Sequence, residues 1–224
     1  MTPVLAFDVY GTLIDTSGIA RSLSARGISD AAAFAARWRD KQLEYTFRRA
    51  LMRRYAPFSE CTKTALDFVC AERAAELSDS DRKDLMAEYA VLPAFADAAP
   101  ALSVLAESDA RMFAFSNGED AAVRRVLKHN RLAEYFADIV SVEDARSFKP
   151  DPQVYAHFLR RAGAAAEHTW LVSGNPFDII GARESGWKTA WVNRGAALFD
   201  PWPQSSPSAV VASLAELPQL ISAR

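Results

Sequence analysis

Short apolar runs alternate with amphipathic stretches along most of the chain. The first run, Val4–Phe7, ends at Asp8, and Gly11 breaks the pattern soon afterwards. Runs bounded in this way indicate buried strands, whereas apolar positions spaced three and four apart indicate helices. The predicted strands are Val4–Phe7, Arg111–Phe115, Ile139–Val142, Thr169–Val172, Thr189–Val192 and Ala209–Val211, and the helices are Asp120–His129, Pro152–Ala162, Phe177–Ser185 and Leu214–Ile221. This alternation predicts right-handed crossovers and a doubly wound parallel α/β sheet.

The stretch from about residue 15 to residue 95 has a different pattern. It contains no convincing strand and indicates several helices, the longest near Asp30–Tyr55. Ser80 followed by Asp81 is typical of a helix start, and Pro93 ends the region. We therefore predict a helical cap domain inserted after the first strand of a core domain. The cap comprises residues 15–95, and the core comprises residues 1–14 and 96–224.

Composition narrows the class of protein. The 224 residues suffice for one good hydrophobic core and a smaller second domain. A formal charge of −2 gives no broad attraction for nucleic acid or anionic lipid, so neither is an expected partner. No stretch approaches the ~18 consecutive apolar residues of a membrane span, and no apolar leader follows Met1. With two cysteines, Cys61 and Cys70, and no C-x-x-C motif, the sequence predicts a reduced, cytoplasmic protein.

Three polar residues fall at the carboxyl ends of predicted strands. Asp8, Ser116 and Ser173 are far apart in sequence, but the ligand crevice of an open α/β sheet lies at these ends. Their convergence on one crevice is thus expected from topology. Asp8 followed by Gly11 could be a nucleophile held among backbone N–H groups. On this pattern alone, an aspartate that merely caps a turn stays possible.

Four motifs occur in the order found in the haloacid dehalogenase superfamily. They are Asp8-x-Tyr10-Gly11-Thr12, Phe115-Ser116-Asn117-Gly118, Lys149-Pro150 and Ser173-x-Asn175-x-x-Asp178. From about Val4 to Arg194 the chain resembles that superfamily, and Trp38-Arg39 with the residues after it resembles the cap of the L-2-haloacid dehalogenase branch. The resemblance implies a Rossmann-like core, a helical cap and a homodimer. It also implies hydrolysis of short (S)-2-haloalkanoic acids to (R)-2-hydroxy acids and halide through an ester on Asp8.

The same resemblance implies a role for each motif residue. The implied catalytic residues are Asp8, Thr12, Lys149, Ser173, Asn175 and Asp178, and the implied substrate- and halide-binding residues are Tyr10, Arg39, Leu43, Phe58, Ser116, Asn117, Tyr155 and Phe177. Asp178 would activate water, Lys149 would orient Asp8, and Arg39 would meet the departing halide. Gly174 departs from the branch, which often has Ser there, and this puts the fine positioning around Ser173 in doubt.

Structural alternatives stand beside these roles. Ser116 could cap a helix ahead of Glu119, and Asp178 suits the dipole at a helix N-terminus. Arg39 lies on the same helical face as Phe47, and its charge could reach solvent or pair within the cap. Without the motif order, Lys149 would be read as a surface lysine, and the aromatic residues as ordinary core.

Two positions argue against phosphate chemistry and against a metal. Phosphatases of the superfamily have an aspartate two residues after the nucleophile, and Tyr10 takes that place. A phenol with a pKa of ~10 is a poor proton shuttle at neutral pH. Asn175 takes a position at which these phosphatases usually have an acidic residue. Because Mg²⁺ prefers anionic oxygen ligands, the neutral amide makes a metal site less favourable. We predict no metal ion and no organic cofactor.

Two other functions remain as alternatives. One is a phosphatase or phosphonate hydrolase on the same fold, which strong Mg²⁺-dependent phosphate release would favour. The other is a noncatalytic binder of small carboxylates, which would bind substrate without turnover. Tyr10 speaks against the first, and the joint presence of Asp8, Lys149 and Asp178 speaks against the second.

Overall fold

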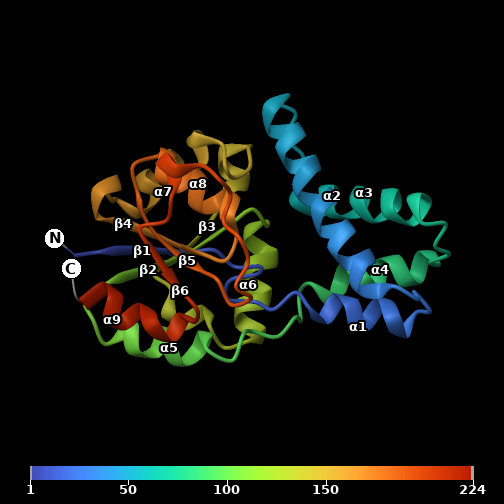
Figure 1. Cartoon of the computed structure of the whole chain (residues 1–224), viewed down its shortest axis with the longest axis horizontal. Helices are drawn as coiled ribbons and strands as arrows, with labels where there is room; N and C mark the ends of the chain where they lie inside the picture. The colour runs from blue at the N-terminus through green and yellow to red at the C-terminus, as the bar shows by residue number, and fades with distance from the viewer. Residues whose placement is uncertain (1, 223–224) are drawn as a thin grey trace.

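A six-stranded parallel sheet lies among helices in the left-hand part of the molecule as drawn in Figure 1. The computed structural model describes residues 2–222. Across the sheet the strands follow the order β3, β2, β1, β4, β5, β6, and each neighbouring pair is parallel. Their bounds are β1 Val4–Phe7, β2 Arg111–Ser116, β3 Asp138–Ser141, β4 Thr169–Ser173, β5 Lys188–Val192 and β6 Ala209–Val211. This is the strand order of a doubly wound fold, so the predicted fold class is confirmed.

Helices cover both faces of the sheet and bury the central strand β1 on both sides. Leu5 and Phe7 of β1 belong to one hydrophobic cluster, and Val4 and Ala6 belong to the other. The first cluster contains apolar residues of α5 (Ala98–Ala106), α6 (Asp120–His129) and α9 (Leu217–Ser222), and the second those of α7 (Pro152–Ala162) and α8 (Pro176–Glu184). Strands buried on two faces are expected to be continuously apolar, as β1 is.

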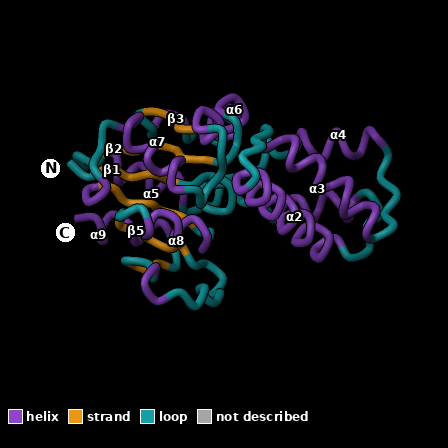
Figure 2. Tube along the Cα trace, turned by 90° about the horizontal axis from the view of Figure 1, so that it is seen from above, coloured by secondary structure: helices purple, strands orange, loops and turns teal. Residues whose placement is uncertain are grey.

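Four further helices project to one side of the sheet (Figure 2). They are α1 Gly18–Ala25, α2 Ala31–Leu51, α3 Phe58–Glu72 and α4 Asp79–Glu88. Trp38 of α2 is fully buried, and its indole Nε1 donates a hydrogen bond of 2.8 Å to the Thr62 carbonyl of α3. The helices thus pack against one another, and most of their buried apolar residues belong to the same hydrophobic cluster as Leu5 and Phe7 of β1.

Two segments connect these helices to the sheet, and the segments run side by side. The Asp15 N–H donates to the Pro93 carbonyl at 2.8 Å, and the Phe95 N–H donates to the Leu13 carbonyl at 2.9 Å. An antiparallel bridge joins Ile14 and Ala94 between them. We propose the domain limits 14/15 and 95/96 on this ground, since both chain crossings lie there.

Several predicted boundaries were wrong. The long cap helix ends at Leu51 and not at Tyr55, because Arg53 adopts a left-handed φ of 55° and the Arg54 N–H turns back to the Arg49 carbonyl. The helix predicted from Ser80 begins earlier, since Ser78 and Asp81 form a reciprocal capping box. The last predicted helix is a 3₁₀ turn, Leu214–Glu216, followed by α9.

Four more 3₁₀ turns lie in the loops of the core. They are Ala133–Tyr135, Val142–Ala145, Ala166–His168 and Pro203–Ser205. The second of them explains why β3 stops at Ser141, one residue before the predicted end. Among residues 2–222, no helix is both long enough and apolar enough to cross a lipid bilayer.

Candidate active site

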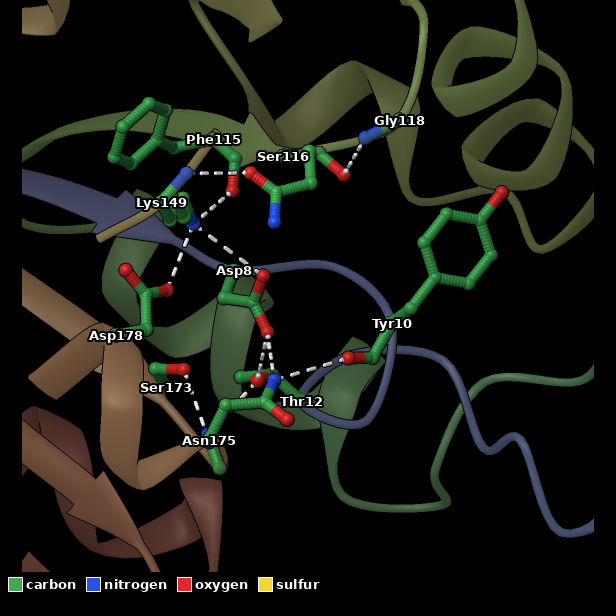
Figure 3. Close-up of polar contacts among 12 residues, drawn as sticks. Asp8, Tyr10, Thr12, Phe115, Ser116, Gly118, Lys149, Ser173, Asn175 and Asp178 are labelled. Carbon is green, nitrogen blue, oxygen red and sulfur yellow. Dashed lines mark hydrogen bonds and ion pairs between the residues drawn. The ribbon is translucent and has the colours of Figure 1, made fainter. Parts of the chain in front are cut away.

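The carboxyl ends of β1, β2 and β4 lie next to one another and carry the site (Figure 3). The chain begins at β1, builds the sheet to one side through β2 and β3, and then crosses to β4 on the other side. β1 and β4 therefore flank the point at which the strand order reverses, where open α/β sheets bind their ligands. Asp8 directly follows β1, and its N–H donates to the Val172 carbonyl of β4 at 3.0 Å.

The two oxygens of the Asp8 carboxylate have unequal surroundings. Thr12 Oγ1 donates to Oδ2 at 2.7 Å, and Asn175 Nδ2 donates to the same oxygen at 2.8 Å. Within the described chain, the one polar partner of Oδ1 is Lys149 Nζ, at the longer distance of 3.4 Å. Hydrogen bonds withdraw electron density from a carboxylate oxygen. Oδ1 is therefore the oxygen better suited to attack an electrophile.

Lys149 is a buried cation between two carboxylates. Its side chain is 1% exposed, and Nζ lies 2.7 Å from Asp178 Oδ2 and 2.8 Å from the Phe115 carbonyl. The same nitrogen lies 4.0 Å from the centroid of the Phe115 ring. A buried ammonium is costly unless it is paired and hydrogen-bonded, and these contacts meet that condition. Lys149 thus couples Asp8 to Asp178.

Asp178 occupies the first turn of α8 and is completely buried. Tyr155 Oη donates to Asp178 Oδ1 at 2.9 Å, so each carboxylate oxygen has a donor. Burial raises the pKa of Asp178 to about 6, although the charge of Lys149 opposes the rise. A carboxylate with a pKa near neutrality can accept a proton from water and return it.

The cap contributes a second cation. Arg39 of α2 places Nη2 3.4 Å from Asn175 Oδ1, while the amide nitrogen of Asn175 donates to Asp8 and, at 3.3 Å, to the Tyr10 carbonyl. The enclosed cavity has a volume of about 20 Å³, enough for about one water molecule. It is lined by Asp8, Tyr10, Arg39, Phe58, Ser116, Asn117, Gly118, Lys149, Asn175 and Phe177.

Tyr10 does not present an acid to the site. Its ring turns away from the Asp8 carboxylate (Figure 3) and packs edge-on against Tyr89, with the ring centroids 6.0 Å apart. Burial raises the pKa of the Tyr10 phenol well above its usual value of 10, so that it stays protonated at any ordinary pH. Tyr10 is therefore a wall of the cavity and not a proton shuttle.

Two predicted residues lie at the end of β2. Ser116 Oγ accepts a hydrogen bond of 3.1 Å from the Gly118 N–H, and Glu119 is the N-cap of α6. The alternative interpretation of Ser116 as a helix cap is therefore wrong. Asn117 Oδ1 accepts a hydrogen bond of 2.9 Å from the Lys149 backbone N–H. The side-chain nitrogen of Asn117 therefore points away from Lys149 and is available to an anion.

The remaining predicted residues divide into two groups. Phe58 and Phe177 line the cavity, whereas Thr12, Tyr155, Ser173 and Asp178 lie behind it. Ser173 Oγ accepts from the Asn175 N–H at 3.1 Å and so shapes the turn that carries Asn175. Leu43, predicted to line the substrate pocket, is not among the residues that enclose it.

Gly174 allows the ends of β1 and β4 to come close together. A Cβ atom at Gly174 would lie 2.6 Å from the Gly11 carbonyl oxygen, a distance that forces the backbone apart. The Gly174 N–H donates to Thr12 Oγ1 at 2.9 Å, and Thr12 in turn donates to Asp8. Glycine at this position therefore preserves the spacing around Ser173.

The sequence prediction missed three contributors. Gly118 lines the cavity, and the Phe115 carbonyl holds Lys149. Gly181 of α8 faces Tyr155, because a Cβ atom built at Gly181 would lie 2.3 Å from Tyr155 Oη. A backbone carbonyl has no sequence signal, but a glycine within a predicted helix is unusual enough to point to a close contact.

Gly181→Ala is expected to destabilise the protein. Alanine would ordinarily favour a helix over glycine by ~1 kcal/mol. Here overpacking against Tyr155 costs ~1–3 kcal/mol and displaces the phenol that holds Asp178. Urea unfolding measures the net loss of stability. Gly18→Ala is the control, since its Cβ would meet only the ends of flexible side chains at 3.3 Å or more; an equal effect of both changes would contradict the assignment.

No group of three or more His, Cys, Asp or Glu side chains within residues 2–222 has the arrangement of a metal site. Asp8 and Asp178 are the two carboxylates joined by Lys149, and the amide of Asn175 lies beside them. The arrangement supplies a nucleophilic carboxylate, a buried proton acceptor and two cations. These four groups suit nucleophilic attack on a carbon whose leaving group departs as an anion.

Comparison with known proteins gives three kinds of match. Residues 2–186 match the family described as haloacid dehalogenase-like hydrolase. The chain is 34% identical to an (S)-2-haloacid dehalogenase of Pseudomonas putida, with 95% of this chain and 93% of the other covered. It is 31% identical to haloacetate dehalogenase H-2 of Moraxella sp. (strain B), with 90% of each covered. An L-2-haloacid dehalogenase from Xanthobacter autotrophicus, solved with chloropropionic acid covalently bound, superimposes with a TM-score of 0.89 at 29% identity over 99% of both chains.

Proposed function

The chain belongs to the haloacid dehalogenase-like hydrolases, and from this we propose that it hydrolyses short (S)-2-haloalkanoic acids to (R)-2-hydroxy acids and halide. The observation that carries the proposal is the asymmetry of the Asp8 carboxylate, which leaves Oδ1 as a nucleophile next to Lys149. The relatives named (S)-2-haloacid dehalogenase, and the covalent chloropropionic acid complex of one neighbour, support the choice of substrate.

In the first step, Asp8 Oδ1 attacks C2 of the haloacid from the side opposite the halogen. A C–O bond forms, the carbon–halogen bond breaks, the configuration at C2 inverts, and halide leaves with the electron pair. Arg39, Asn117 and Phe177 line the cavity, which supports the proposal that they bind the departing halide. Ser116 lines the same cavity, and in the proposal it donates a hydrogen bond to the substrate carboxylate.

In the second step, water attacks the carbonyl carbon of the Asp8 ester. Asp178 accepts a proton from this water and returns it to the departing 2-hydroxy acid oxygen, so that the Asp8 carboxylate is regenerated. Lys149 contacts both carboxylates and keeps them close to each other, and Tyr155 fixes the rotation of the Asp178 side chain. Two steps are required because the nucleophile belongs to the protein.

We propose that neither step needs a metal ion or another cofactor. The ammonium of Lys149 lies between Asp8 and Asp178, where it offsets their charge. Tyr10 and Asn175 supply neutral groups at positions where metal-dependent phosphatases of the superfamily have acidic ones. A homodimer stays a prediction of the family resemblance, and a cytoplasmic location stays a prediction from the sequence.

Halide release tests the proposal. In EDTA, the protein is expected to release chloride from the S enantiomer of 2-chloropropionate in preference to the R enantiomer, with fluoroacetate assayed alongside. In a single turnover in ¹⁸O-water, the product hydroxyl is expected to carry unlabelled oxygen from Asp8, and the label enters the Asp8 carboxylate. Label in the first product, or Mg²⁺-dependent release of phosphate without any halide release, would contradict the proposal.

The rate of turnover is expected to fall as the pH falls through about 6. Burial raises the pKa of Asp178 to about 6, and only the ionised carboxylate can accept a proton from water. Below that pH, kcat should drop ~10-fold per unit. Lys149→Met removes the charge that opposes this rise, so the acidic limb of its kcat profile should shift to higher pH. A pH-rate profile that stays flat through this range would contradict the role of Asp178.

A further inference from the structure

An apolar groove lies directly behind one wall of the proposed active site. The groove has a volume of about 640 Å³, whereas the enclosed cavity at Asp8 has about 20 Å³. Apolar side chains that line the groove include Phe47, Leu51, Phe148, Ile180 and Trp202. Phe177 lines both spaces, so the groove and the cavity adjoin at this residue.

A second ring holds Phe177 in this position. Phe47 of α2 meets Phe177 of α8 edge-on, with the ring centroids 5.4 Å apart and the ring planes at 69°. Phe47 lies about two helical turns beyond Arg39 on α2. Arg39 contacts Asn175 and Phe47 contacts Phe177, so both residues join α2 to the core. The Phe47 and Phe177 rings therefore close the path between the cavity and the groove.

We propose that Phe47 is a specificity-determining residue that limits the length of the acyl chain of the substrate. The carboxylate and C2 would stay at Ser116 and Asp8, and the alkyl tail of a longer 2-haloalkanoic acid would point toward the groove. With Phe47 in place, the tail meets the Phe177 ring. Without Phe47, the Phe177 ring can turn aside and the tail enters the groove. This inference rests on the proposed dehalogenase function.

The chemistry of the groove selects an alkyl tail as its occupant. Most of its lining residues are apolar and come from both α2 and the core, and three charged residues, Arg53, Asp151 and Asp200, complete the wall. Transfer of apolar surface from water into such a space favours binding by up to about fourfold per methylene group. Three added methylenes could therefore change kcat/KM by more than tenfold, which is large enough to measure.

The test compares halide release from 2-bromopropionate and from 2-bromohexanoate. Phe47→Ala is expected to raise the ratio of kcat/KM for the longer acid to that for the shorter one by about tenfold or more. Phe177 lines the cavity for both acids, so any effect of its movement on the reacting carbon or the halide is common to both, and the ratio isolates the effect on the alkyl tail. Leu51→Ala is the matched control: Leu51 lies one turn further along α2 and is 85% exposed, so the ratio should stay unchanged.

A second substitution tests whether the groove itself is used. Ala50 also lines the groove, and Ala50→Leu added to Phe47→Ala should narrow the groove beside α2 and reduce the gain. If Phe47→Ala does not fold, Phe47→Leu should give a smaller gain in the same direction. An unchanged ratio in a folded variant, or an equal rise for both acids, would overturn the inference and leave the proposed function intact. No halide from any acid with the unmodified protein would overturn both.

Discussion

Asp8→Asn is expected to reduce halide release by about 10⁴-fold or more, the scale of loss when an enzyme is deprived of its nucleophile. The amide has no anionic oxygen with which to displace halide from C2. It retains the size of the side chain and can still accept from Thr12, whose Oγ1 lies 2.7 Å from Asp8 Oδ2. Halide release from (S)-2-chloropropionate under saturating substrate measures the effect.

The control for this change is Asp120, an aspartate at the start of α6 and outside the proposed site. Asp120→Asn removes a carboxylate that pairs with Arg124 in the first turn of α6, and it should leave turnover unchanged. Lys149 keeps Asp178 as an anionic partner in Asp8→Asn, so the variant is expected to fold, which a thermal melt verifies. A folded Asp8→Asn protein with near-normal halide release would exclude Asp8 as the nucleophile.

The sheet could be predicted from the sequence because its signals are local. A buried parallel strand is a short apolar run, and a residue such as Asp8 or Ser116 directly after that run must lie at its carboxyl end. The order of the strands then brings β1, β2 and β4 together whatever the sequence distance between them. Hence the fold and the place of the site followed from runs of four to six residues.

Features set by contacts between distant segments could not be predicted in the same way. The inequality of the two Asp8 oxygens depends on Asn175, which approaches from β4, and the end of α2 depends on the backbone angle of Arg53. Leu43 follows Arg39 by four residues and so lies near it on α2, but this spacing does not show how far along α2 the cavity extends. Local periodicity gives the face of a helix, whereas packing decides which turn of that face meets a ligand.

Asp178→Asn is expected to separate the two steps of the proposed reaction. Removing the proton acceptor should slow hydrolysis of the ester by ~10²–10⁴-fold, whereas the attack by Asp8 on C2 needs no such base. The variant should therefore release about one halide per active site in a burst and then nearly stop. Mass spectrometry of the quenched protein should find a propionate group added to the peptide that contains Asp8.

The loss of Asp178 also changes the surroundings of Lys149, and this sets the expected rate of the burst. Lys149 Nζ lies 2.7 Å from Asp178 but 3.4 Å from Asp8, so without Asp178 it is free to move toward Asp8 Oδ1 and weaken that oxygen as a nucleophile. The burst should be slower than the first step in the unmodified protein, yet complete. Tyr155→Phe is the matched control, because it removes the hydrogen bonds of the phenol to Asp178 Oδ1 and to the Asp178 carbonyl but keeps the carboxylate, so turnover should continue without a trapped ester. Steady turnover by Asp178→Asn would show that water is activated elsewhere, and an arrested protein that carries no adduct on Asp8 would show that Asp178 is needed before the ester forms.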